Sequence, residues 1–76
     1  MYTVGKCLLS DILEEIDMTQ SELADRLGVT KQQINTYVTN RRTMDLVTAK
    51  NISIIVDRDI SDLYEWVHVH YRTKRR

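Results

Sequence analysis

The chain has 76 residues, is 42% hydrophobic and 29% charged, and carries a formal net charge of zero. This length excludes a large catalytic cleft, the composition excludes a disordered tail, and the charge balance excludes a binder that acts through positive charge alone. We expect one domain over residues 1–70 and a basic tail over residues 71–76. The charge is segregated, because residues 31–50 hold four basic side chains and one acidic side chain. That segment is the one suited to meet a polyanion.

The first predicted element is a helix between Gly5 and Ile16, where apolar residues recur at helical spacing. Proline is absent and glycine occurs only twice, which favours a chain built entirely from helices. Cys7 has no cysteine partner for an internal disulfide. We expect it on this helix as a packed thiol rather than a nucleophile.

A second helix is predicted from about Gln20 to Leu27. Thr19 precedes Glu22 by three positions, which is the spacing of a capping box. In that motif the hydroxyl caps the helix start while the carboxylate returns to the main-chain N–H of the capping residue. The helix therefore has a defined beginning.

A third helix is predicted from about Lys31 to Val38, after a very short connection. Gly28 can adopt positive φ and end the preceding helix abruptly, and Thr30 offers a hydroxyl cap for the next one. So short a link requires the two helices to cross at a steep angle.

Two further helices complete the predicted set. Asp45 is placed to cap a fourth helix, in which apolar residues repeat from Leu46 to Val56. Ser61 is placed to cap a last helix that holds Leu63, Trp66 and Val67. The sequence therefore predicts an all-α, compact five-helix domain.

The pair of helices around Gly28 has the residue types of a helix-turn-helix. A helix that reads base pairs must be held on the surface of the fold by a second helix packed across it. This arrangement requires a small residue at the crossing, here Ala24, and a glycine at the turn. It also requires apolar anchors on the buried sides, which are Leu23, Leu27, Val29, Ile34 and Tyr37.

The segment from Thr19 to Thr30, TQSELADRLGVT, resembles the opening of the helix-turn-helix in the Cro and phage-repressor (XRE) family. The segment from Ile60 to Trp66 is similar to the one that opens the fifth helix in many members. The likeness covers about residues 9–66. It implies a lambda-repressor-like fold and a regulator that occupies operator DNA, of phage or mobile-element type.

The resemblance also implies roles for particular residues. Lys31, Gln32, Asn35 and Thr36 fall at base-facing positions of the third helix. Lysine can donate to guanine, glutamine can pair with adenine and a threonine methyl can touch thymine, while Asn35 is placed to reach a base or the sugar-phosphate. The residues that the resemblance places on the DNA backbone are Thr19, Gln20, Asn40, Arg41 and Arg42.

The end of the third helix departs from the family pattern. Many members have a glutamate and a glycine there, whereas this chain has Val38, Thr39 and Asn40. Met44 stands where a proline often follows the basic pair. Asn40 tolerates positive φ, so the helix can still end at this point.

The C-terminal apolar residues raise the question of partners. Trp66, Val67 and Tyr71 offer more apolar surface than one short helix needs, so they either complete the core or form a homodimer through the C-terminal helix. The basic tail is either a solvated terminus or a further DNA contact. A second hypothesis for the whole chain is a protein-interaction module of the same fold, such as an antirepressor or antitoxin.

Several other classes of function are not expected. There is no set of residues for catalysis, and His68 and His70 point to different faces of a helix, so neither an enzyme nor a metal or cofactor site is predicted. The sequence has no signal peptide and no apolar run of the roughly 20 residues that span a membrane, which predicts a cytoplasmic protein.

Overall fold

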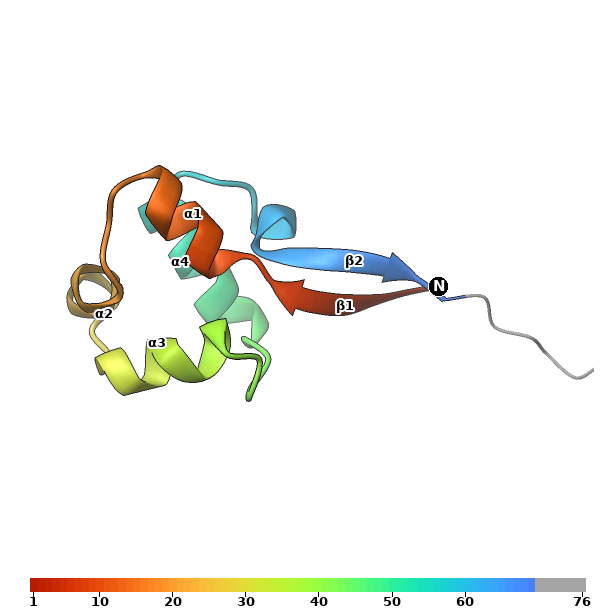
Figure 1. The fold of residues 1–76 in the computed structure, drawn as a ribbon, viewed down its shortest axis with the longest axis horizontal. Coiled ribbons are helices and arrows are strands. Elements are labelled where there is room, and N and C mark those ends of the chain that lie inside the picture. Colours follow the sequence, from red (N-terminus) through yellow and green to blue (C-terminus); the bar gives the residue numbers. More distant parts are fainter. Residues whose placement is uncertain (70–76) are drawn as a thin grey trace, which may run out of the picture.

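A computed structural model describes residues 1–69, which form four α-helices, one 3-10 helix and a two-stranded sheet (Figure 1). In chain order the elements are β1 (Tyr2–Cys7), α1 (Leu9–Glu15), α2 (Gln20–Leu27), α3 (Lys31–Val38), α4 (Leu46–Val56), the 3-10 helix η1 (Ile60–Leu63) and β2 (Tyr64–His68). The predicted basic tail, residues 71–76, lies outside the described residues.

The predicted starts of α2, α3 and α4 are confirmed. The Thr19 hydroxyl accepts a hydrogen bond from the Glu22 main-chain N–H, and a Glu22 carboxylate oxygen accepts from the Thr19 N–H, so the capping box of α2 is complete. Thr30 caps α3 through its hydroxyl, and Asp45 caps α4 through its carboxylate. Each cap satisfies a main-chain donor that the helix itself leaves unpaired.

Each α-helix is followed by a residue in the left-handed region. These residues are Asp17, Gly28, Asn40 and Asp57, with φ between 56° and 80°. Aspartate and asparagine tolerate this conformation better than other residues that have a Cβ atom. A chain with two glycines can therefore end four helices sharply.

The prediction of an all-α, five-helix domain is wrong at both ends of the chain. The predicted helix from Gly5 to Ile16 begins only at Leu9, and Cys7 lies on strand β1. The helix predicted after Ser61 is replaced by η1 and then by β2, which carries Trp66 and Val67. Aromatic and β-branched residues fit a pleated surface, and pairing of the two segments satisfies main-chain groups along both.

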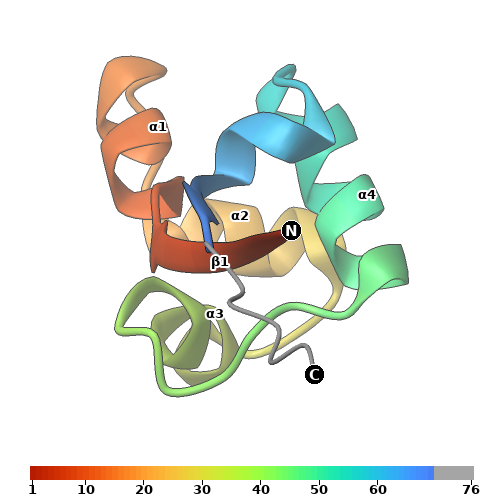
Figure 2. The same cartoon turned by 90° about the vertical axis from the view of Figure 1, so that its right-hand side faces the viewer.

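The two strands form an antiparallel ribbon that extends away from the helices (Figures 1 and 2). Val4 is opposite Trp66 and Cys7 is opposite Tyr64, with an irregularity between these two pairs. Gly5 lies in the irregular stretch, where an added Cβ would lie 3.1 Å from a Val67 methyl carbon. The glycine thus allows a close approach between the strands.

The core lies among the four helices, η1 and the base of the ribbon. Its fully buried members are Leu9, Leu23, Ile34, Ile52, Val56 and Leu63. The predicted apolar side of α4 is confirmed for Ala49, Ile52 and Val56, which are buried, and is wrong for Leu46, which is 77% exposed. Within residues 1–69, no helix combines the length and apolar character required to cross a membrane.

Candidate nucleic-acid interface

Helices α2 and α3 pack against each other and place α3 along one edge of the body (Figures 1 and 2). Ala24 and Leu23 of α2 are buried, as are Ile34 and Tyr37 of α3. Gly28, with φ at 80°, makes the turn, and its N–H donates to the Ala24 carbonyl over 2.8 Å. The buried anchors therefore fix which side of α3 faces outward.

The outward side of α3 carries the residues predicted to read bases. Lys31, Gln32 and Asn35 are exposed, and Thr36 is half-buried. The Thr36 hydroxyl donates to the Gln33 carbonyl over 2.6 Å. Its proton is therefore engaged within the helix, which leaves the methyl group as the part of Thr36 suited to an apolar contact.

The start of α2 has the predicted capping box, which limits the donors available to a phosphate there. The Thr19 main-chain N–H is taken by Glu22, so only the hydroxyl proton of Thr19 remains as a donor for a phosphate. Gln20 is half-buried, and its side-chain oxygen is buried without a hydrogen-bond partner among residues 1–69. The predicted phosphate contacts of both residues stay predictions.

The end of α3 has the hydrogen bonds of a Schellman motif. The Asn40 N–H donates to the Tyr37 carbonyl over 3.1 Å, and the Arg41 N–H donates to the Thr36 carbonyl over 3.0 Å. The Arg42 N–H shares the same Thr36 acceptor at 3.2 Å. The main chain of both arginines is therefore attached to the last turn of α3, while both residues are exposed.

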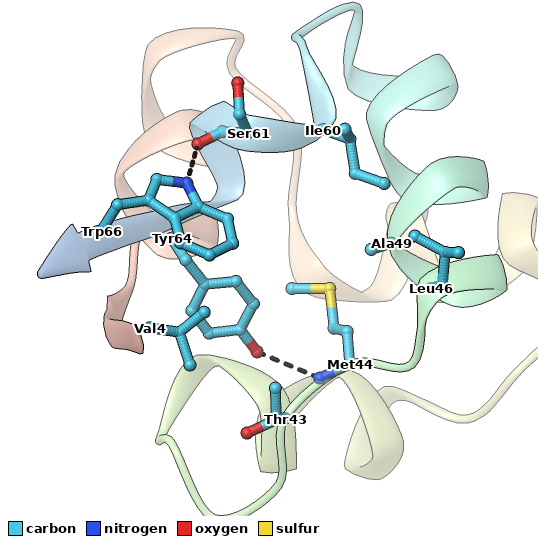
Figure 3. A pocket seen from close by; sticks show the side chains of 9 residues that line it. All are labelled: Val4, Thr43, Met44, Leu46, Ala49, Ile60, Ser61, Tyr64 and Trp66. Carbon is cyan, nitrogen blue, oxygen red and sulfur yellow. Dashed lines mark hydrogen bonds between the residues drawn. The ribbon is translucent and has the colours of Figure 1, made fainter. Parts of the chain in front are cut away.

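Residues 40–44, which include Arg41 and Arg42, form a basic loop, and the base of the ribbon holds both of its ends. The sequence did not predict this attachment. The Asn40 side-chain oxygen accepts from the Cys7 N–H of β1 over 3.0 Å. The Tyr64 hydroxyl of β2 accepts from the Met44 N–H over 3.1 Å (Figure 3). Cys7 and Tyr64 are paired across the ribbon, so one strand pair fixes the loop at residues 40 and 44.

The sequence of these elements also matches that of a known protein family. A family model described as "Helix-turn-helix" matches residues 9–63, which is more than half of the chain. The chain belongs to the helix-turn-helix family. This membership confirms the sequence-based identification of an XRE-type helix-turn-helix.

A curated relative of this helix-turn-helix protein comes from Bacillus subtilis (strain 168). It is the SPbeta prophage-derived uncharacterized HTH-type transcriptional regulator YopS, which is 36% identical over 66 residues. The aligned region covers 83% of this chain and 86% of the relative. The likeness covers most of both proteins and, together with the family match, confirms the expectation of a DNA-binding transcriptional regulator.

Cys7 belongs to the hydrophobic core of the helix-turn-helix domain. Its side chain is buried, and burial raises the pKa of the thiol, although the Leu9 N–H and the Tyr64 hydroxyl oppose the shift. A raised pKa keeps the thiol neutral at physiological pH. The prediction of a packed thiol is confirmed, but on a strand rather than a helix.

Proposed function

We propose that this helix-turn-helix protein binds double-stranded operator DNA in the cytoplasm and regulates transcription there. Helix α3 enters the major groove, which is about 12 Å wide and admits one α-helix. The observation that carries the proposal is the division of α3 into two sides. Ile34 and Tyr37 anchor it in the core, while Lys31, Gln32 and Asn35 stand exposed.

Base recognition is assigned to four side chains of α3. Lys31 donates to guanine, Gln32 forms a two-bond contact with adenine, and Asn35 reaches a neighbouring base or the sugar-phosphate. Thr36 contacts a thymine methyl through its own methyl group, because its hydroxyl proton is engaged with Gln33. Each good base contact contributes about 1–3 kcal/mol of discrimination.

Contacts with the phosphates are assigned to the two flanks of α3. Arg41 and Arg42 meet one strand from the loop that the ribbon holds, and Gln20 and the Thr19 hydroxyl meet phosphates at the start of α2. Asn40 is assigned a phosphate contact through its amide N–H groups, because the bond from Cys7 uses only its side-chain oxygen. The same bond lets Asn40 position the two arginines.

A titration of a selected DNA site tests this proposal. The Gln32→Ala variant is compared with Gln33→Ala, a matched control on the same helix whose amide donates to the Tyr37 hydroxyl. Loss of one base contact weakens binding by roughly 5- to 150-fold, which corresponds to about 1–3 kcal/mol. We expect that loss for Gln32→Ala and little change for Gln33→Ala.

The phosphate assignment is tested on the same site by varying the salt concentration. Arg41→Ala is expected to lower the salt slope by about 1, because one fewer counterion is released on binding. Lys6→Ala removes a charge from strand β1 and serves as the control, with an unchanged slope expected. If no DNA sequence is enriched and neither Gln32→Ala nor Arg41→Ala alters binding, the proposal fails and a protein-binding role replaces it.

A further inference from the structure

The two strands of the ribbon lie outside the part of the chain that matches the helix-turn-helix family. The match covers residues 9–63, whereas β1 ends at Cys7 and β2 begins at Tyr64. The basic loop, residues 40–44, lies inside the match. A part of the fold that the family match does not cover therefore holds the segment to which phosphate contacts are assigned.

Tyr64 is the residue through which β2 reaches that loop. Its side chain is buried, and its hydroxyl accepts from the Met44 main-chain N–H over 3.1 Å (Figure 3). The same hydroxyl forms a hydrogen bond with the Cys7 thiol, while the Cys7 N–H donates to the Asn40 side-chain oxygen. One buried pair of residues, Cys7 and Tyr64, thus connects the two ends of the loop.

An extra residue in β1 brings Cys7 to this place. From Val4 to Cys7 the strand β1 advances three positions, while β2 advances only two from Trp66 to Tyr64. In a regular antiparallel ladder Lys6 would stand opposite Tyr64, because residues pair one to one. Such bulges change the direction of a side chain. Here the bulge places a buried thiol, rather than a lysine, beside Tyr64.

Met44 supplies a donor that many relatives of this sequence lack. It stands where a proline often follows the basic pair in the family, and proline has no main-chain N–H. Met44 is buried, so its N–H needs an acceptor within the fold. The bond to Tyr64 can therefore form only because this chain departs from the family pattern at position 44.

The two arginines between these attachments are available to a phosphate. Both are exposed, and within residues 1–69 neither guanidinium forms a salt bridge. The main-chain N–H groups of Arg41 and Arg42 share the Thr36 carbonyl, which fixes the start of the loop on α3. The bond between Met44 and Tyr64 fixes the other end, two positions after Arg42. The path of the chain through both arginines is thus set from both sides.

We propose that Tyr64 is a positioning residue for operator binding, which acts through Met44 on the phosphate contacts of Arg41 and Arg42. It rests on the proposed function, because those contacts are assigned there. A loop that is already held in one arrangement loses less conformational entropy when it meets a phosphate. Loss of the Tyr64 hydroxyl therefore weakens the phosphate contacts. The base-facing side of α3 keeps its sequence preference, because phosphate contacts carry no sequence information directly.

The test is titration of a selected DNA site at several salt concentrations, with Tyr64→Phe compared with Tyr2→Phe. Tyr2 is 65% exposed and its hydroxyl bonds to no group within residues 1–69, so Tyr2→Phe is the matched control. Circular dichroism at the assay temperature checks that both variants are folded. We expect Tyr64→Phe to weaken binding by about 2- to 30-fold and to lower the salt slope by about 0.5–1. Tyr2→Phe is expected to match wild type.

Combined substitutions separate positioning from a general loss of stability. When Arg41→Ala and Arg42→Ala are both present, Tyr64→Phe is expected to cause no further loss of affinity, because the contacts through which it acts are absent. Equal weakening by Tyr64→Phe with and without the two arginines overturns the proposal. Wild-type affinity and salt slope in Tyr64→Phe, or a changed base preference, also overturn it.

Main-chain order parameters from NMR relaxation test the positioning without DNA. We expect values near about 0.85 at Arg41 and Arg42 in wild type, and values that fall toward about 0.6 in Tyr64→Phe. Wild-type values already below about 0.6 overturn the proposal, even if Tyr64→Phe does not fold. A loop that is ordered in wild type and loosened in Tyr64→Phe, in a chain that enriches no DNA sequence, contradicts the proposed function and not the positioning by Tyr64.

Discussion

Asn40 performs two tasks whose energies can be separated by substitution. Its main chain has φ at 61°, and its side-chain oxygen accepts from the Cys7 N–H. Alanine removes the acceptor and disfavours the left-handed conformation. Glycine removes only the acceptor, while aspartate retains an oxygen acceptor and tolerates positive φ.

The expected magnitudes follow from the environment of Cys7, which is 2% exposed. A buried N–H left without an acceptor costs about 1–3 kcal/mol. The left-handed conformation costs alanine about 1–2 kcal/mol more. We therefore expect Asn40→Ala to lower the free energy of unfolding by roughly 2–5 kcal/mol and Asn40→Gly by roughly 1–3 kcal/mol. Asn40→Asp is expected to stay close to wild type.

Thermal unfolding followed by circular dichroism measures these differences. For a domain of this size, 1 kcal/mol lowers Tm by about 4–8 °C. Binding of a selected DNA site is expected to weaken in the same order, because the Arg41 and Arg42 loop loses one of its two attachments to the ribbon. If Asn40→Gly unfolds at the wild-type temperature, the hydrogen bond to Cys7 does not stabilise the fold and the reasoning is refuted.

Three further substitutions test other parts of the fold. Gly28→Val is expected to lower stability by at least about 1–2 kcal/mol, through the backbone alone, because an added Cβ at Gly28 meets no atom within 4 Å; an unchanged Tm would contradict this. Tyr64→Phe leaves the Met44 N–H without its acceptor and is expected to lower the free energy of unfolding in urea by about 1–3 kcal/mol. A wild-type midpoint would contradict a stabilising attachment of Met44 to the ribbon. The Thr19 N–H and hydroxyl lower the pKa of Glu22 below its usual 4.5, so its stabilisation is complete above pH 4.5 and is lost as pH falls through the depressed value. Glu22→Gln is expected to flatten the dependence of Tm on pH below 4.5, and an unaltered profile would count against the capping box.

The helix-turn-helix could be predicted because its signals are local. Thr19, Gly28 and Thr30 each act on main-chain groups within a few residues, and the apolar spacing of α2 and α3 needs no knowledge of distant segments. The boundaries of both helices are confirmed for that reason. The base-facing roles of residues on α3 come from the family resemblance and stay predictions.

The ribbon could not be predicted in the same way because each strand is specified by the other. The nearest residues of Tyr2–Cys7 and Tyr64–His68 are 57 positions apart, and no hairpin turn joins the two strands to indicate that they pair. The sequence shows that Trp66 and Val67 offer more apolar surface than a short terminal helix needs. The prediction of a helix there is nevertheless wrong, because both residues lie on β2. A run of aromatic and β-branched residues was the available signal for a strand.

The position of the basic loop could not be predicted either, because it depends on the pairing of β1 with β2. Asn40 was recognised as a residue able to end α3 at positive φ, and this is confirmed. Its bond to Cys7 joins positions 33 residues apart, and the bond from Met44 to Tyr64 spans 20. Such long-range contacts are visible only after β1 and β2 are paired.

The most direct measurement of the central claim, that α3 reads bases with its outward side, is selection from random DNA by wild type and by Gln32→Ala. We expect wild type to enrich one sequence and Gln32→Ala to lose preference mainly at the base that Gln32 contacts, while Gln33→Ala retains the wild-type sequence. Identical preferences for wild type and Gln32→Ala, or enrichment of no sequence by wild type, would contradict the account.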